Sequence, residues 1–251
     1  MGSDAEIVVV KDPPALAETA ARTIVDAAGE AVAARGRFTI ALAGGATPRE
    51  TYERLALPPL RDAMPWDRTW VFFGDERAVE PDHPESNYRM AREALLSRVP
   101  VAADRIVRMR GEADDRDAAA ADYARTLAEV FHTRRGELPR FDLVLLGLGV
   151  DGHTASLFPG SPVLKEVFRP VAAVHAAAAA VPERITLTYP VLNAAARVLF
   201  LVAGAEKAKV VKTVLGDEAL LPAGMVRPAD GRLTWLLDRA AAALLPTAGG
   251  G

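Results

Sequence analysis

The chain has 251 residues, is 50% hydrophobic and 25% charged, and has a net charge of −3, which is typical of a folded globular protein. Its acidic balance offers no basic surface for a nucleic-acid backbone, so no nucleic-acid partner is expected. The absence of cysteine excludes disulfides, thiolate metal ligands and cysteine nucleophiles, and it fits a reducing compartment. The N-terminus lacks a basic region, and no apolar stretch approaches the ~20 residues of a membrane helix. A soluble, cytoplasmic protein without a membrane partner is therefore expected.

Short apolar runs alternate with helical patterns along the chain. In order, the pattern predicts a strand at 7–10, a helix at 13–35, a strand at 38–43, a helix at 48–55, a strand at 70–73, helices at 86–99 and 114–134, strands at 141–146, 185–188 and 198–202, a helix at 205–215, a strand at 234–237 and a terminal Ala-rich helix. Strands that are apolar throughout predict an α/β fold, with a mostly parallel sheet and helices on both faces. No repeat or linker divides the chain, so a single domain over 1–251, ordered at about 6–245, is expected.

Glycines and charged residues gather directly after three of the predicted strands. These segments are 44–49, 74–77 and 147–153. In open α/β sheets, ligands bind outside the carboxyl ends of the strands. The three segments therefore predict one composite pocket, built from parts that are far apart in the sequence.

The first segment, Gly44-Gly45-Ala46-Thr47-Pro48, joins a strand to a helix. Glycine lets the backbone approach an anion closely, and a helix N-terminus offers unpaired N–H groups and a favourable dipole. The segment therefore suits a phosphate, although a tight strand-to-helix turn explains the same residues equally well. It matches neither the Walker pattern nor the dinucleotide fingerprint, and the 147–149 segment lacks the third glycine. No nicotinamide cofactor is expected.

The third segment contains Asp151-Gly152-His153, the sharpest local signal in the sequence. His153 follows a buried strand and stands next to a carboxylate in a glycine-rich loop. An imidazole in that setting can act as a general base near neutral pH, because the carboxylate stabilises its protonated form. A hydrogen-bonded structural histidine explains the pattern equally well. Neither H-E-x-x-H nor another zinc-ligand spacing is present, so no metal is expected.

Three basic residues are candidates for an anion site. Arg77 follows the Gly74-Asp75-Glu76 turn, Arg184 opens a strand, and Lys207 lies in the first turn of the predicted helix at 205–215. A basic side chain at a helix N-terminus opposes the macrodipole, and a bound anion would resolve that conflict. Each of the three is also compatible with an ordinary solvated surface charge.

These segments, taken together, resemble the 6-phosphogluconolactonase family, whose relatives include the glucosamine-6-phosphate deaminases. The resemblance runs in order through nearly the whole chain. The blocks that carry it are 43–48 with Tyr52 and Leu55, 73–77 with 86–88, 147–160, 184–188 and 204–207. The block at 147–160 is the most specific of them.

The resemblance implies a single α/β domain with a modified Rossmann-like sheet of the deaminase and lactonase type. It also implies hydrolysis of 6-phospho-D-glucono-1,5-lactone to 6-phospho-D-gluconate, the second step of the oxidative pentose phosphate pathway. His153 would be the general base that activates water, Asp151 would orient it, and Asp75 would lie near the sugar. No metal or cofactor is implied, because a lactone carbonyl needs only base assistance and oxyanion donors.

The same resemblance implies a site for the substrate's phosphate group. The residues that would hold it are Gly44, Gly45, Thr47, Arg77, Arg184 and Lys207. The expected partner is thus a phosphorylated sugar lactone. A transient contact with glucose-6-phosphate dehydrogenase, which supplies the lactone, is a further candidate, and the sequence leaves monomer and homodimer both open.

Two other functions are weighed against the lactonase. In the deaminases, a glutamate after the Asp-Gly-His triplet partners the histidine, whereas this chain carries no acid at 154–159 and has Phe158 at roughly the glutamate's place. A sugar-phosphate-sensing regulator would need an added helix-turn-helix and a basic surface. The first predicted strand begins at Ile7 and the charge is acidic, so the sequence favours the lactonase over both.

Overall fold

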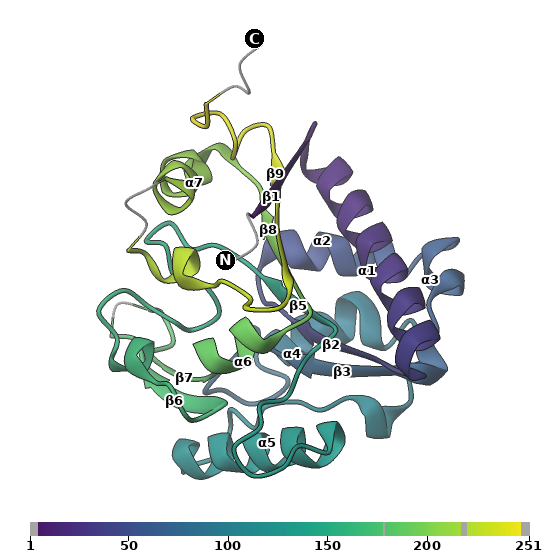
Figure 1. The fold of residues 1–251 in the computed structure, drawn as a ribbon, viewed down its shortest axis with the longest axis vertical. Coiled ribbons are helices and arrows are strands. Elements are labelled where there is room, and N and C mark those ends of the chain that lie inside the picture. Colours follow the sequence, from purple (N-terminus) through teal and green to yellow (C-terminus); the bar gives the residue numbers. More distant parts are fainter. Residues whose placement is uncertain (1–4, 178, 217–219, 247–251) are drawn as a thin grey trace.

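The computed structural model describes residues 5–177, 179–216 and 220–246. Its centre is a six-stranded, fully parallel sheet in the order β1-β9-β8-β5-β2-β3 (Figure 1). The strands are β1 (Glu6–Val10), β9 (Arg232–Asp238), β8 (Arg197–Val202), β5 (Leu143–Leu146), β2 (Phe38–Leu42) and β3 (Thr69–Phe73). The predicted α/β fold with a mostly parallel sheet is confirmed.

A second, antiparallel sheet of three strands adjoins the first. Its order is β4 (Asp75–Arg77), β7 (Glu183–Leu187) and β6 (Val171–His175). Gly74 joins the two sheets: its N–H donates to the carbonyl of Leu42 in β2, and its carbonyl accepts from the N–H of Leu187 in β7. The chain therefore passes directly from strand β3 of the parallel sheet into strand β4 of the antiparallel sheet.

Helices cover both faces of the parallel sheet. One face packs against α1 (Pro13–Arg35), α2 (Ala46–Leu55), α3 (Leu60–Ala63) and α4 (Asn87–Ala91). The other packs against α5 (Arg116–Phe131), α6 (Tyr189–Ala194), α7 (Ala208–Leu215) and the small sheet. Single helical turns lie at Trp66–Arg68, Arg92–Leu96, Ala103–Arg105, Pro162–Lys165, Ala205–Lys207 and Pro222–Met225.

The two cores follow from the alternation of side chains along each strand. In β5, Leu143 and Leu145 belong to the core beneath α1 and α2, whereas Val144 and Leu146 belong to the opposite core. Successive side chains of a strand point to opposite faces, so a strand covered on both sides must be apolar at every position. All four of these residues are at most 1% exposed.

Local signals set the ends of the longest helix. The Oδ1 of Asp12 accepts a hydrogen bond from the N–H of Ala15 at 2.9 Å, and Pro13 and Pro14 occupy the first turn, where a missing N–H costs nothing. Helix α1 ends at Gly36, whose φ of 74° is left-handed. The boundaries of this helix agree with the prediction.

Several elements differ from the prediction. The Ala-rich segment after β9 forms turns over 239–244 and not a helix, because so short a segment gains little from propensity without a packed apolar face. The predicted helix at 86–99 is α4 followed by a π turn that ends at Leu96. Strand β6 and helix α6 are not predicted, since neither segment has a long periodic pattern.

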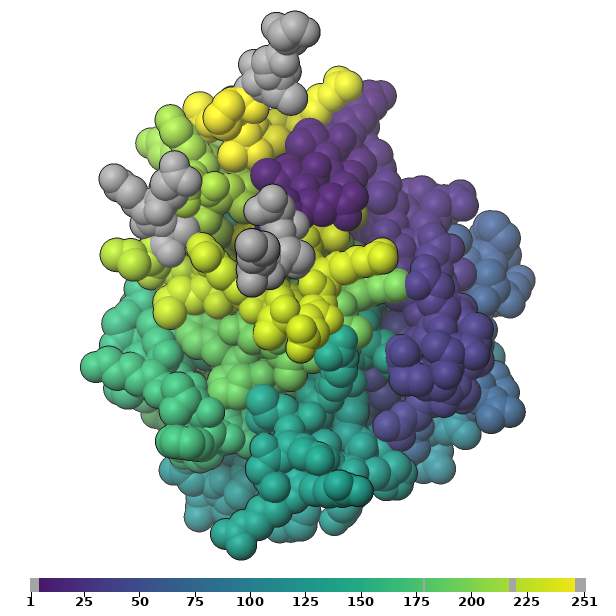
Figure 2. Space-filling view, in the orientation of Figure 1, coloured from purple at the N-terminus to yellow at the C-terminus, as the bar shows by residue number. Residues whose placement is uncertain are grey.

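Segments from the two ends of the described chain lie side by side. Strand β1 pairs in parallel with β9, and Figure 2 shows the N-terminal segment in purple against the C-terminal segment in yellow. All six strands of this sheet point the same way, so their carboxyl ends meet at one edge. The loops that follow β2, β3, β5 and β8 are thereby brought together, although they are far apart in the sequence.

Candidate active site

A pocket of about 360 Å³ lies at the carboxyl ends of the parallel strands. Eight of the nine sequence-predicted site residues line it: Gly44, Gly45, Thr47, Asp75, Arg77, His153, Arg184 and Lys207. The ninth, Asp151, stands behind His153, outside the lining. The structure therefore brings together residues that follow β2, β5 and β8 with residues of strands β4 and β7, as the sequence predicts for one composite pocket.

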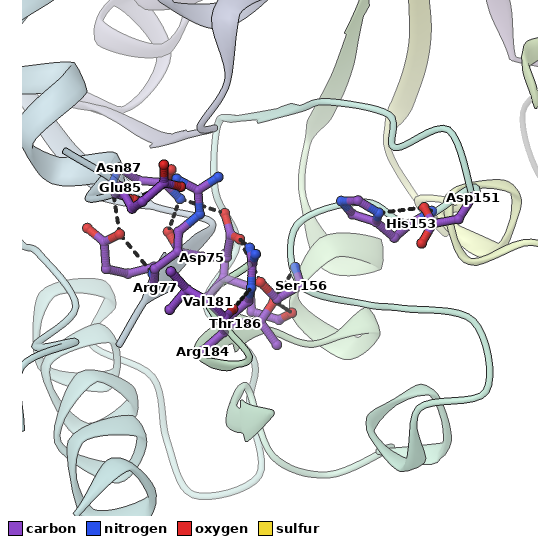
Figure 3. Close-up of polar contacts among 12 residues, drawn as sticks. Asp75, Arg77, Glu85, Asn87, Asp151, His153, Ser156, Val181, Arg184 and Thr186 are labelled. Carbon is purple, nitrogen blue, oxygen red and sulfur yellow. Dashed lines mark hydrogen bonds and ion pairs between the residues drawn. The ribbon is translucent and has the colours of Figure 1, made fainter. Parts of the chain in front are cut away.

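His153 is oriented by Asp151 through two hydrogen bonds. The Nδ1 of the imidazole lies 2.5 Å from Oδ1 of Asp151, and the backbone N–H of His153 donates to the same oxygen at 3.1 Å. A carboxylate only accepts, so this contact assigns the proton to Nδ1 and leaves Nε2 as an acceptor. In Figure 3 the end of the imidazole ring opposite Asp151 points toward the group of side chains that includes Asp75 and Arg184.

The loop around this pair depends on glycine at one position of close approach. A Cβ on Gly149 would lie 2.1 Å from Nδ1 of His153 and 2.6 Å from Oδ1 of Asp151. Burial raises the pKa of Asp151, but the hydrogen bonds and charge supplied by His153 outweigh it and lower the pKa overall. Asp151 is thus an anion at neutral pH, suited to stabilise a protonated imidazole.

Phe158 links the histidine to the basic side of the pocket. Its ring centroid lies 4.3 Å from that of His153 at an interplanar angle of 30°, and the guanidinium carbon of Arg184 lies 5.4 Å from the Phe158 centroid. These distances fit a ring contact and a cation–π contact. One side chain therefore packs against both the imidazole and the guanidinium.

Asp75 is buried, at 6% exposure, and its carboxylate already has protein partners (Figure 3). Its Oδ2 accepts a hydrogen bond of 2.7 Å from the hydroxyl of Ser156 and lies 3.9 Å from Nη1 of Arg184. Its Oδ1 accepts from Nδ2 of Asn87 at 3.1 Å. With both oxygens engaged, the carboxylate suits the orientation of neighbouring groups better than proton transfer.

Hydrogen bonds to backbone carbonyl groups hold the guanidinium groups of Arg77 and Arg184 in place. Arg77 donates from Nη1 to the carbonyl of Glu85 at 2.7 Å, and Arg184 donates from Nε to that of Val181 at 3.0 Å. Burial lowers the pKa of Arg184, Arg77 lowers it further, and Asp75 opposes both. A buried cation beside a second cation is an environment that favours a bound anion.

The turn after β2 is built for close approach. Gly45 caps α2 with a φ of 106° and provides no side-chain hydrogen bond to its first turn, and Gly45, Ala46 and Thr47 line the pocket. A Cβ on Gly44 would lie 1.9 Å from Oδ1 of Asn87. The hydroxyl of Tyr52 donates to the carbonyl of Ala43 at 2.8 Å and accepts from its N–H at 2.9 Å, which fixes the strand end.

Lys207 is half-buried at the start of α7, where it ends the turn Ala205–Lys207. Its ammonium group makes no ion pair with a side chain among the residues that the structure describes. The predicted conflict with the helix dipole is therefore present in the structure.

Sequence reasoning missed three residues of this site. Asn87 and Glu206 line the pocket, and Ser156 hydrogen-bonds Asp75. Asn87 and Ser156 are 1% and 0% exposed, and buried polar residues of this kind are informative. The signal that could have found them was their position inside motif blocks: Asn87 in 86–88, Ser156 in 147–160 and Glu206 in 204–207.

Two properties of the described part of the chain bear on the site. Within residues 5–177, 179–216 and 220–246, no group of three or more histidine, aspartate or glutamate side chains is placed to hold a metal ion. No helix in the same ranges is long and apolar enough to cross a membrane.

The family model for glucosamine-6-phosphate isomerases/6-phosphogluconolactonase matches residues 11–235. This chain belongs to that family. It is 42% identical to a 6-phosphogluconolactonase of Nostoc sp. over 240 residues, which cover 94% of this chain and 97% of the relative. It is 41% identical to that of Rattus norvegicus, with coverage of 95% and 93%.

Solved structures of the family agree in fold. The 6-phosphogluconolactonase from Trypanosoma cruzi superposes with a TM-score of 0.87 at 32% identity, covering 98% of this chain and 99% of its own. A monomeric glucosamine-6-phosphate deaminase has a TM-score of 0.77 at 24% identity, with coverage of 95% and 99%, and shows the shared fold alone. The modified Rossmann-like sheet of the deaminase and lactonase type is thereby confirmed.

Proposed function

We propose that this chain hydrolyses 6-phospho-D-glucono-1,5-lactone to 6-phospho-D-gluconate, a step of the oxidative pentose phosphate pathway, with His153 as general base. The observation that carries the mechanism is the 2.5 Å contact between His153 Nδ1 and Asp151, because it leaves Nε2 as the acceptor in a residue that lines the pocket. The relatives named 6-phosphogluconolactonase support the choice of substrate.

The reaction needs one proton acceptor that becomes a donor. Nε2 of His153 takes a proton from water as the water oxygen attacks the lactone carbonyl carbon, and Asp151 stabilises the imidazolium that forms. The tetrahedral intermediate then collapses, the bond from C1 to the ring oxygen breaks, and Nε2 returns its proton to that oxygen. This last transfer regenerates the neutral base, and the product carboxylic acid releases its own proton to solvent.

The phosphate binds where positive charge meets free N–H groups. Arg184 and Lys207 neutralise the dianion, Arg77 adds a third cation, and the α2 N-terminus donates from the backbone. Two observations favour this site: Arg184 is a buried cation next to Arg77, and Lys207 opposes its own helix dipole. A bound phosphate dianion offsets both the repulsion between the two arginines and the unfavourable position of Lys207 in the helix dipole.

Asp75 acts in this scheme as a positioning residue. Its hydrogen bonds from Ser156 and Asn87 and its contact with Arg184 hold the arginine at the pocket wall. The sugar hydroxyls then meet a wall whose charges are already fixed, which lowers the cost of ordering side chains on binding.

The decisive experiment follows hydrolysis of freshly generated 6-phosphogluconolactone by the wild type and His153→Ala. The lactone opens unaided in water, so only the excess over spontaneous hydrolysis counts. A large excess that collapses in the variant supports both the reaction and its base. A folded wild-type protein without excess refutes the lactonase, and ammonia release from glucosamine-6-phosphate would then test the deaminase.

A further inference from the structure

Asp238 is a buried carboxylate that the proposed mechanism does not use. It ends strand β9 and is 2% exposed. Both of its oxygens accept from the N–H of Gly204 at 3.2 Å, and Oδ1 also accepts from the N–H of Ala241 at 2.7 Å. The carboxylate therefore ties the end of β9 to Gly204 in the loop that follows β8.

Gly204 begins the turn that carries Lys207 to the pocket. The N–H of Lys207 donates to the carbonyl of Gly204 at 3.1 Å. The N–H and the carbonyl of Gly204 are therefore both hydrogen-bonded, to Asp238 and to Lys207. Gly204 has a φ of 104°, and a Cβ there would lie 2.4 Å from the Glu206 carboxylate. The left-handed φ favours glycine at this position, and Asp238 anchors the turn at the Gly204 N–H.

We propose that Asp238 is a positioning residue that sets where Lys207 enters the pocket. This proposal rests on the proposed function, in which Lys207 binds the phosphate of the substrate. The lysine stem is flexible, so the position of its ammonium group depends on where the turn holds the backbone. A small misplacement of a binding group costs affinity even when the group itself is present.

Asp142 provides a matched control at the opposite end of the sheet. It is also a buried carboxylate beside a strand, at 7% exposure, and it accepts from the N–H and hydroxyl of Thr39 at 2.7 and 2.8 Å. Asp142 lies outside the lining of the substrate pocket. Its loss should weaken the fold without moving Lys207.

The first experiment compares Asp238→Asn and Asp142→Asn for kcat, KM and thermal unfolding. The amide keeps one acceptor oxygen but places an NH2 donor where the second oxygen accepts from the Gly204 N–H, which should displace the turn. Asp238→Asn should therefore raise KM for the phosphorylated lactone by about three- to tenfold and leave kcat within about twofold. Asp142→Asn should lower Tm while leaving KM unchanged. Equal effects of both variants on KM would overturn the positioning role.

The second experiment is a double-mutant cycle with Lys207→Ala. If Asp238 acts through Lys207, adding Asp238→Asn to Lys207→Ala should raise KM no further. Additive effects would overturn the proposal. If Lys207→Ala raises KM and Asp238→Asn does not, only the role of Asp238 is wrong. If Lys207→Ala itself leaves KM unchanged, the phosphate assignment fails as well.

A glycine variant keeps the proposal testable should Asp238→Asn fail to fold. Gly204→Ala forces the same turn to shift while Asp238 remains intact, so KM should rise in the wild-type background and not in the Lys207→Ala background. Gly36→Ala is its control, because Gly36 also has a left-handed φ of 74° but has open space around its Cβ position. A KM rise in Gly36→Ala, or none in Gly204→Ala, would contradict the proposal.

Discussion

Arg77 of β4 and Arg184 of β7 are register partners, directly opposite each other on adjacent antiparallel strands. Like charges in that position repel, and here both side chains line the same pocket. Arg184 is also among the buried residues, at 9% exposure. Such a pair is unfavourable in an empty pocket and favourable around a dianion, which links the small sheet to the proposed phosphate site.

Removal of either arginine should weaken binding more than chemistry. A charge-assisted hydrogen bond is worth about 1.5–3 kcal/mol, so Arg184→Ala should raise KM for the phosphorylated lactone at least about tenfold with a smaller change in kcat. Glucono-1,5-lactone, which lacks the phosphate, should be affected far less. Arg197→Ala is a control, because Arg197 pairs with Glu30 away from the pocket. Unchanged KM in Arg184→Ala and Arg77→Ala would contradict the phosphate site.

His153→Ala should abolish most of the enzymatic excess over spontaneous hydrolysis. General-base assistance is typically worth about 10²–10⁴-fold, and kcat should fall by that order with the circular dichroism spectrum retained. Asp151→Asn should also lower kcat, because an amide neither fixes the Nδ1 proton nor stabilises the imidazolium. Stopped assays against a no-enzyme control measure both. Near-full activity of His153→Ala would remove it from the mechanism.

Phe158→Leu should lower kcat while leaving the fold intact. The aromatic ring packs against His153, and leucine keeps an apolar side chain but loses the flat contact. We expect a several-fold fall in kcat and a smaller change in Tm. Phe168→Leu is the matched control, since Phe168 is 85% exposed. Equal kinetic effects of the two substitutions would argue against a positioning role for Phe158.

Gly44→Ala should damage the site through Asn87. The new Cβ would lie 1.9 Å from Oδ1 of Asn87, so the amide that donates to Asp75 must shift. Overpacking of this kind typically costs about 1–3 kcal/mol, and kcat/KM should fall together with the free energy of unfolding. Gly29→Ala has open space around its Cβ inside helix α1, so it should leave kcat/KM unchanged and raise the free energy of unfolding by about 0.5–1 kcal/mol. Wild-type kinetics in Gly44→Ala would show that the turn tolerates the side chain.

Glu166 should make the fold sensitive to acid. Backbone N–H groups of Arg169 and Phe168, then the Arg169 side chain, lower its pKa from 4.5 to about 2. A depressed folded-state pKa contributes stability above the unfolded value and loses it as pH falls from 4.5 toward 2. Urea unfolding should show Glu166→Gln less stable than wild type at pH 7, with the difference shrinking below pH 4.5. A difference that is constant with pH would contradict this origin.

Much of the site was predictable because its signals are local. Asp151 and His153 are two residues apart in a glycine-rich loop, and their contact needs little more than that spacing. The apolar strands predicted a parallel sheet, and a parallel sheet brings the ends of its strands to one edge. The turn at Gly44 and the loop at Gly149 follow from the same rule.

Other features of the site depend on hydrogen bonds between residues far apart in the sequence, which no local pattern predicts. Asp75 receives a hydrogen bond from Ser156, 81 positions away, and Glu76 is buried because it accepts from the N–H groups of Asn87 and Tyr88 at the start of α4. A polar tripeptide such as Asp75–Arg77 does not predict a strand, and it becomes one by pairing with β7.

The sequence by itself therefore determined the six strands of the parallel sheet, the order of the loops and the Asp151–His153 pair. Each of these follows from the periodicity of apolar residues or from contacts within a few positions. The tertiary structure alone decided that Arg77 faces Arg184, that Ser156 and Asn87 engage Asp75, and that Asp238 anchors the turn before Lys207. Those relationships join segments far apart in the chain, and only the packing of the two sheets and their helices selects them.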